Sequence, residues 1–198
     1  MGKDNSPKLL DWGDEKNGPV KINGKLLVNK DLLVGNVQQD TDSCVYIATL
    51  FMAHVCGDGT YDNVSKSILK NADRFGTVIE TIKNTNFQGY DRMSKFQAKQ
   101  YLLESLPKDN SPMSMSYMQE GNETVGETSK RILNDGYISM LEQNGHVFVG
   151  VGESESGKLI VWDTLLGEPE HGLREVDPNS KNLTMFLCAK VNDKFVAR

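Results

Sequence analysis

The sequence has few cysteines and histidines and no long apolar run, and these shortages exclude several classes of protein. No segment approaches the roughly 18 consecutive apolar residues of a membrane helix, so we expect a soluble chain that does not enter a membrane. Met1–Lys8 is polar and has no apolar core of a secretory signal. The net charge is −5 with both signs interspersed, so the basic stripe of a nucleic-acid-binding protein is lacking.

The three cysteines, Cys44, Cys56 and Cys188, are odd in number and widely spaced. They form neither a disulfide framework nor a paired pattern that would bind zinc. At least one thiol is therefore expected to be free, and no metal or cofactor is expected.

The length of 198 residues suits one domain, and 38% hydrophobic with 25% charged residues is ordinary for a globular protein. Residues 1–35 are rich in Gly, Asn, Asp and Lys. Their short apolar pieces at Val20–Ile22 and Lys25–Val28 predict a lead-in segment with two short strands. Residues 36–198 are predicted to form the functional domain.

The first half of that domain is predicted to be helical. Cys44–Val55 is apolar nearly all round, which is typical of a helix buried inside a domain, and the polar residues Asp40–Ser43 can cap it. Two further helices are predicted at Asp62–Ala72 and Arg92–Leu106. Between them, Thr77–Ile82 fits either a strand or a short helix.

The second half is predicted to be rich in antiparallel strands. Thr124 and Glu127 have the spacing of a capping box that opens a helix through Leu133, and Met113–Met118 is predicted to be extended. Strands joined by Gly-containing turns are predicted at Tyr137–Leu141, His146–Gly152, Leu159–Asp163 and Leu183–Val191. Helices followed by antiparallel strands indicate an α+β fold.

Cys44 is the best candidate for a nucleophile, because it lies in the first turn of the most apolar helix. A helix N-terminus favours the thiolate form, which is the reactive one. The alternative is that Cys44 is a small buried core residue, the commoner fate of a free cysteine. For Cys56 and Cys188, at a helix end and within a strand, the core interpretation is favoured.

His146 and Asp163 are candidates for the base and for the residue that orients it. His146 opens a predicted strand, and Asp163 ends the next one, so a hairpin would bring them together. Taken alone, His146 is equally compatible with a surface histidine, and Asp163 with an acidic residue in a turn. His54 lies roughly 15 Å along the helix from Cys44 and is too far to act as its base. His171 lies in a polar loop. Trp162, next to Asp163, could cover the pair of His146 and Asp163 or belong to the core.

Gln38 precedes Cys44 in the loop that leads into the helix. Its side-chain amide, with the Cys44 backbone N–H, could form an oxyanion hole. Gln39 is an adjacent competitor that the sequence does not separate from it. The order of Gln, Cys, His and Asp on suitable elements is more informative than any one of them.

These residues together resemble the papain-like cysteine proteases, and most closely the bacterial group related to double-glycine leader peptidases. The resemblance is carried by Gln38–Cys44 and the following helix, by Gly145–Gly152, and by Gly157–Asp163. It covers roughly Val37–Val55 and Lys130–Leu166. Val45 and Thr164 depart from the Gly and Pro that are common in that group.

The resemblance implies a papain-like fold, with the nucleophile at a helix N-terminus packed on an antiparallel sheet. It assigns Gln38 to the oxyanion hole, Cys44 as nucleophile, His146 as base and Asp163 as orienting residue. The expected activity is a cysteine endopeptidase that forms a thioester with a protein substrate. The expected setting is the cytosol of a target cell, reached as a secreted toxin or effector, with an inhibitor or immunity protein as a further partner.

Three alternatives remain open at this level. The same framework serves peptidoglycan amidases or endopeptidases, and it serves glutamine deamidases or transglutaminases. From a different class, the chain could be a non-catalytic protein-binding module in which Cys44 is ordinary core. Selective labelling of Cys44 near neutral pH separates an enzyme from such a module.

Overall fold

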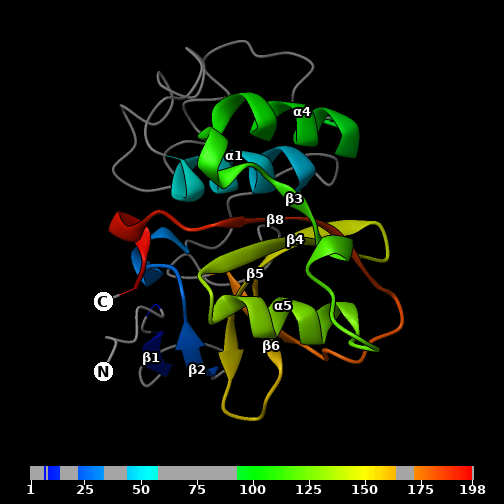
Figure 1. Ribbon diagram of the computed structural model, residues 1–198. Coiled ribbons are helices and arrows are strands. Elements are labelled where there is room, and N and C mark those ends of the chain that lie inside the picture. The colour runs from blue at the N-terminus through cyan, green and yellow to red at the C-terminus, as the bar shows by residue number, and fades with distance from the viewer. Residues whose placement is uncertain are drawn as a thin grey trace.

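An antiparallel sheet of eight strands forms the centre of the molecule in the computed structural model, which describes residues 7, 9–13, 22–33, 44–57, 93–163 and 172–197 (Figure 1). The strand order is β1-β2-β5-β4-β8-β3, while β6 pairs with β5, and β7 pairs with β6. The strands are β1 (Leu10–Gly13), β2 (Asn23–Leu26), β3 (Met113–Ser114), β4 (Tyr137–Gln143), β5 (His146–Ser154), β6 (Leu159–Trp162), β7 (Leu173–Val176) and β8 (Leu183–Lys190).

Three α-helices in the described part of the chain cover this sheet. They are α1 (Cys44–Cys56), α4 (Lys95–Ser105) and α5 (Val125–Leu133). Helices α1 and α4 pack against each other on one side of the sheet, and α5 lies on the other side (Figure 1). Single 3-10 turns occur at η1 (Lys30–Leu32), η2 (Lys108–Asn110), η3 (Met115–Tyr117) and η4 (Asp193–Phe195). The predicted α+β class is confirmed.

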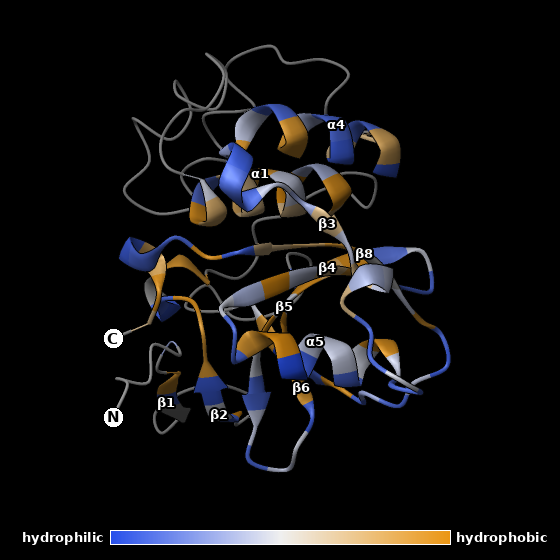
Figure 2. Cartoon of the chain, viewed as in Figure 1, coloured by the Kyte–Doolittle hydropathy of each residue, from blue (hydrophilic) through white to orange (hydrophobic). Residues whose placement is uncertain are grey.

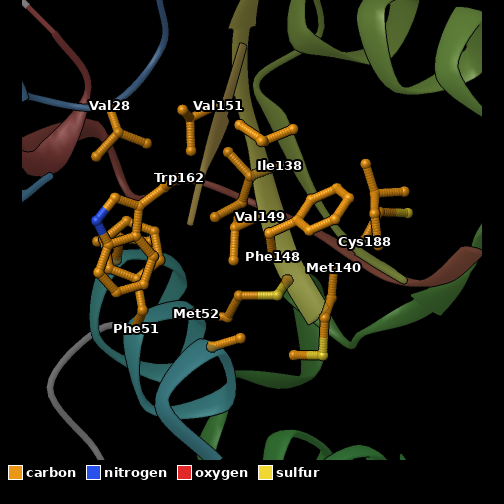
Figure 3. Packing of buried hydrophobic residues seen from close by; sticks show 14 of the residues in the cluster. Val28, Phe51, Met52, Ile138, Met140, Phe148, Val149, Val151, Trp162 and Cys188 are labelled. Atoms are coloured by element: carbon orange, nitrogen blue, oxygen red, sulfur yellow. The ribbon is translucent and has the colours of Figure 1, made fainter. Parts of the chain in front are cut away.

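Helix α1 is the centre of the hydrophobic core, as its apolar sequence predicts. Phe51 and Met52 are fully buried, and the ring of Phe51 stacks on Trp162 of β6 with centroids 4.5 Å apart (Figure 3). Trp162 is itself 0% exposed and therefore belongs to the core. Burying such aromatic and aliphatic side chains contributes roughly 1.5–3 kcal/mol each, which holds α1 firmly on the sheet.

The β4–β5 hairpin turns on two residues with positive φ, Asn144 at 52° and Gly145 at 78°. A two-residue turn of this kind matches the twist of antiparallel strands, and an Asn-Gly pair tolerates it. The turn fixes Gln143 opposite His146. As a result, the imidazole lies at the very start of β5.

Helix α4 begins later than predicted because Ser94 caps it. The Ser94 hydroxyl accepts a hydrogen bond from Gln97 N at 3.2 Å, and Gln97 Oε1 accepts one from Ser94 N at 2.8 Å. This capping box ends the extended chain before Lys95. At α5 the predicted N-cap bond forms, from Glu127 N to Thr124 Oγ1 at 3.1 Å. Hydrophilic and hydrophobic segments alternate along α4 (Figure 2).

Other sequence predictions are corrected or lie outside the described residues. Met113–Met118 is extended only over β3, because the chain then coils into the 3-10 turn η3. Strands β1 and β7 were not predicted. The predicted helix Asp62–Ala72, the segment Thr77–Ile82 and the domain boundary after residue 35 lie outside the described residues.

Candidate active site

Cys44 is the first residue of α1, and its side chain is buried at 5% exposure. The first backbone N–H groups of a helix have no partner within the helix, and they carry partial positive charge. A thiolate placed there is stabilised by this charge. The prediction that Cys44 opens the helix is confirmed.

His146 and Asp163 are brought together by the hairpin that joins β5 and β6. The His146 Nε2–H donates a hydrogen bond to Asp163 Oδ1 at 2.7 Å. Val149 of β5 pairs with Trp162, the last residue of β6. Asp163 follows Trp162 and therefore lies beside Phe148, which is two residues from His146 along β5. Residues two apart on a strand share a face, which explains why these side chains meet diagonally.

The thiol of Cys44 completes the group by interacting with the imidazole of His146. Since Nε2 faces Asp163, the ring nitrogen left for the sulfur is Nδ1. Burial alone would raise the pKa of the Cys44 thiol, but hydrogen bonds from His146 and the Val147 backbone, with the imidazolium charge, lower this pKa below its ordinary value. Folding thus brings together side chains about a hundred positions apart in the sequence.

The hydrogen bond to Asp163, reinforced by the one to Cys44, raises the pKa of His146 to about 9. Burial opposes this shift but does not overcome it. The lowered Cys44 pKa and the raised His146 pKa both favour the pair of thiolate and imidazolium. This charge state is the one that a cysteine nucleophile requires.

Arg174 on β7 is a member of this group that the sequence did not reveal. Its Nε–H donates a hydrogen bond to Asp163 Oδ2 at 2.8 Å, and its guanidinium lies over the Phe148 ring, 4.6 Å from the centroid. In the sequence, Arg174 precedes Glu175 in a short polar stretch, which is typical of a solvated surface. No local signal marks it, because its role depends on the pairing of β6 with β7.

The remaining candidates of the sequence lie elsewhere. His54 packs on Phe195, with ring centroids 4.6 Å apart, in agreement with its exclusion as a base. Cys56 and Cys188 are buried in the core, and burial raises the pKa of both thiols. Gln38, Gln39 and His171 lie outside the described residues, so the oxyanion role remains a prediction.

Within the described ranges, no three His, Cys, Asp or Glu side chains gather as metal ligands. None of the helices described there is both long enough and apolar enough to cross a membrane. Comparison with protein-family models, curated proteins and solved structures found no match to this chain.

Proposed function

We propose that this protein is a cysteine endopeptidase of papain-like architecture that cleaves a protein substrate through a thioester intermediate. The observation that carries the proposal is one chain of contacts. A thiol at the start of a buried helix interacts with an imidazole, and the other nitrogen of that imidazole is held by a carboxylate that is only 1% exposed.

Each step of the reaction follows from this arrangement. The Cys44 thiolate attacks the carbonyl carbon of the scissile peptide bond, and the carbonyl oxygen takes up the negative charge. The His146 imidazolium then gives its Nδ1 proton to the leaving amine, which departs as the C–N bond breaks. Water next attacks the thioester while His146 accepts a proton, and the acid leaves as the Cys44 thiolate is restored.

Asp163 acts on His146 and makes no bond to the substrate in this scheme. Its carboxylate fixes the ring so that Nδ1 faces the sulfur, and it stabilises the imidazolium by charge. Loss of Asp163 should therefore slow the reaction less than loss of Cys44.

The test is a search for new protein N-termini after a proteome is incubated with the wild-type protein or with Cys44→Ala. We expect new N-termini with the wild type and none with the variant, because Ala has no nucleophile and is well tolerated at a helix start. Cys56→Ala is the matched control, since Cys56 is buried at the opposite end of the same helix. It should retain the wild-type cleavage pattern. Equal cleavage by wild type and Cys44→Ala would refute the proposal.

The same pair of proteins distinguishes the other chemistries of this framework. Cys44-dependent release of fragments from purified peptidoglycan would indicate a cell-wall amidase or endopeptidase. Cys44-dependent conversion of glutamine side chains without chain cleavage would indicate a deamidase or transglutaminase. Either result would replace the endopeptidase proposal while leaving the roles of Cys44 and His146 intact.

A further inference from the structure

The Asp163 carboxylate is 1% exposed and is held from both sides. Oδ1 accepts from His146 Nε2 at 2.7 Å, and Oδ2 accepts from Arg174 Nε at 2.8 Å. A charge removed from water is costly unless an opposite charge and hydrogen bonds compensate it. His146 contributes to this compensation only when it is protonated, whereas Arg174 contributes whether His146 is charged or neutral.

The sheet places Arg174 for this contact. Asp163 N donates to Gly172 O at 2.7 Å, so Gly172 is the β7-side neighbour of Asp163, and Arg174 lies two residues further on the same face. The Phe148 ring lies against the guanidinium, and a cation over an aromatic face is attracted to it. Both contacts fix the direction of the Nε–H.

We infer that Arg174 is a positioning residue that holds the Asp163 carboxylate toward His146 and lets the imidazolium release its proton during the reaction. This inference rests on the proposed function, in which His146 alternates between charged and neutral forms. An arginine remains charged throughout, so Asp163 keeps one cationic partner after the proton has left. Without Arg174, the buried carboxylate would lose a charged partner, and the imidazolium beside it would hold its proton more tightly.

The charged surroundings of the imidazole support this effect among the described residues. The imidazole interacts with Cys44 and Asp163, and Arg174 contacts the other oxygen of the Asp163 carboxylate. Gln143, opposite His146 on β4, is uncharged, and Glu142 beside it forms an ion pair with Lys95 at 2.6 Å. Glu175 follows Arg174 on β7 and points to the other face of the sheet. Among the described residues, Arg174 is therefore a cation whose removal should act on His146 through Asp163.

The experiment measures the pKa of His146 by NMR titration, with Cys44→Ala as the parent so that the thiol does not titrate. Arg174→Gln removes the charge but keeps a donor, and we expect it to raise the His146 pKa by about one unit. Arg174→Lys keeps the charge and should stay close to the parent. Arg131→Gln is the matched control. Arg131 lies on α5, and its Nε also donates to a carboxylate, that of Glu123 at 2.9 Å, so its replacement should leave the His146 pKa unchanged.

An unchanged or lowered His146 pKa in Arg174→Gln would overturn the inference, because a purely structural role would alter stability without this upward shift. Arg174→Met is a second neutral variant for the case that Gln prevents folding, since its stem can still cover Phe148. The thermal unfolding midpoint and the native His54 resonance verify the fold. The titration needs no substrate, so its failure is distinguishable from failure of the proposed function.

Discussion

The charge state of Cys44 depends on His146, and this dependence can be measured without a substrate. The imidazolium lowers the thiol pKa against the opposing effect of burial. The thiolate forms as the pH rises through this lowered pKa, and the imidazolium is lost as the pH rises through about 9. We therefore expect activity in a window between these two values, with iodoacetamide alkylation of Cys44 beginning below the pH that an ordinary thiol requires.

His146→Ala should move the alkylation of Cys44 to higher pH, because burial then acts on the thiol without the imidazolium. Mass spectrometry of the labelled peptide, taken across a pH series, measures this shift. If the variant and the wild type have the same alkylation profile, the thiol and the imidazole are not coupled.

His54 should act on stability and not on catalysis. Burial, with the charge of Lys194, lowers the pKa of His54 to about 4. His54 binds a proton near pH 6.5 in the unfolded chain but only near pH 4 in the folded chain. The folded state therefore loses stability as the pH falls from about 6.5 to about 4. The slope is at most about 1.4 kcal/mol per pH unit. Urea unfolding at pH 7 and pH 4.5 measures the free energy of unfolding of the wild type and of His54→Phe. Between these two pH values the wild type should lose more of this free energy than the variant, and equal losses would contradict the prediction.

The residues of the site could be predicted from the sequence to the extent that each begins or ends a recognisable element. Cys44 opens an apolar helix, and His146 follows an Asn-Gly turn, so local patterns placed both. Arg174 could not be found in this way. Its importance comes from a carboxylate on the neighbouring strand, and strand pairing is a long-range property that leaves no mark near residue 174.

At the scale of elements, the glycines of β5 set how closely β2 can approach. A Cβ on Gly152 would fall on the carbonyl oxygen of Lys25, whereas a Cβ on Gly150 would meet only Leu141 Cδ1 at 3.5 Å and Leu159. Gly152→Ala should therefore push β2 away and reduce the free energy of unfolding by more than about 2 kcal/mol. Gly150→Ala, two residues away on the same strand, should change it by less than about 1 kcal/mol. Urea unfolding measures both, and equal effects would disprove the close approach.

The elements that the sequence predicted best are those with a strong local signal. Helix α1 is a long apolar run, whereas helix α5 is marked by its N-cap and strands β4 to β6 by the Gly-containing turns between them. Strand β7 was missed because its four residues, Leu-Arg-Glu-Val, carry two charges in the middle and show no clear alternation. It becomes a strand because the edge of β6 offers hydrogen bonds, and tertiary context of this kind overrides local propensity.

At the scale of the whole molecule, the end of α1 is tied to β8 by polar side chains. The Asn110 side chain donates to Cys56 O at 3.0 Å and to Lys190 O at 2.7 Å, and it accepts from Lys190 N at 3.0 Å. Asn192 N donates to Val55 O at 2.7 Å. Helix and sheet are therefore joined at the end of α1 that lies opposite Cys44, and we expect them to open as one cooperative unit.

The two core thiols report on this cooperative unit. Cys56 on α1 and Cys188 on β8 are 2% and 0% exposed, so each should be alkylated only when the structure around it opens. If α1 and β8 open together, both thiols should react with the same denaturant dependence. Asn110→Ala should accelerate both by about tenfold, because losing its hydrogen bonds costs on the order of 1–2 kcal/mol. Cys44 is also buried, but its pKa is lowered while that of the other two thiols is raised, so it should react first in both proteins and serve as the internal control. Acceleration of Cys56 without Cys188 would show that the helix frays from a sheet that stays closed.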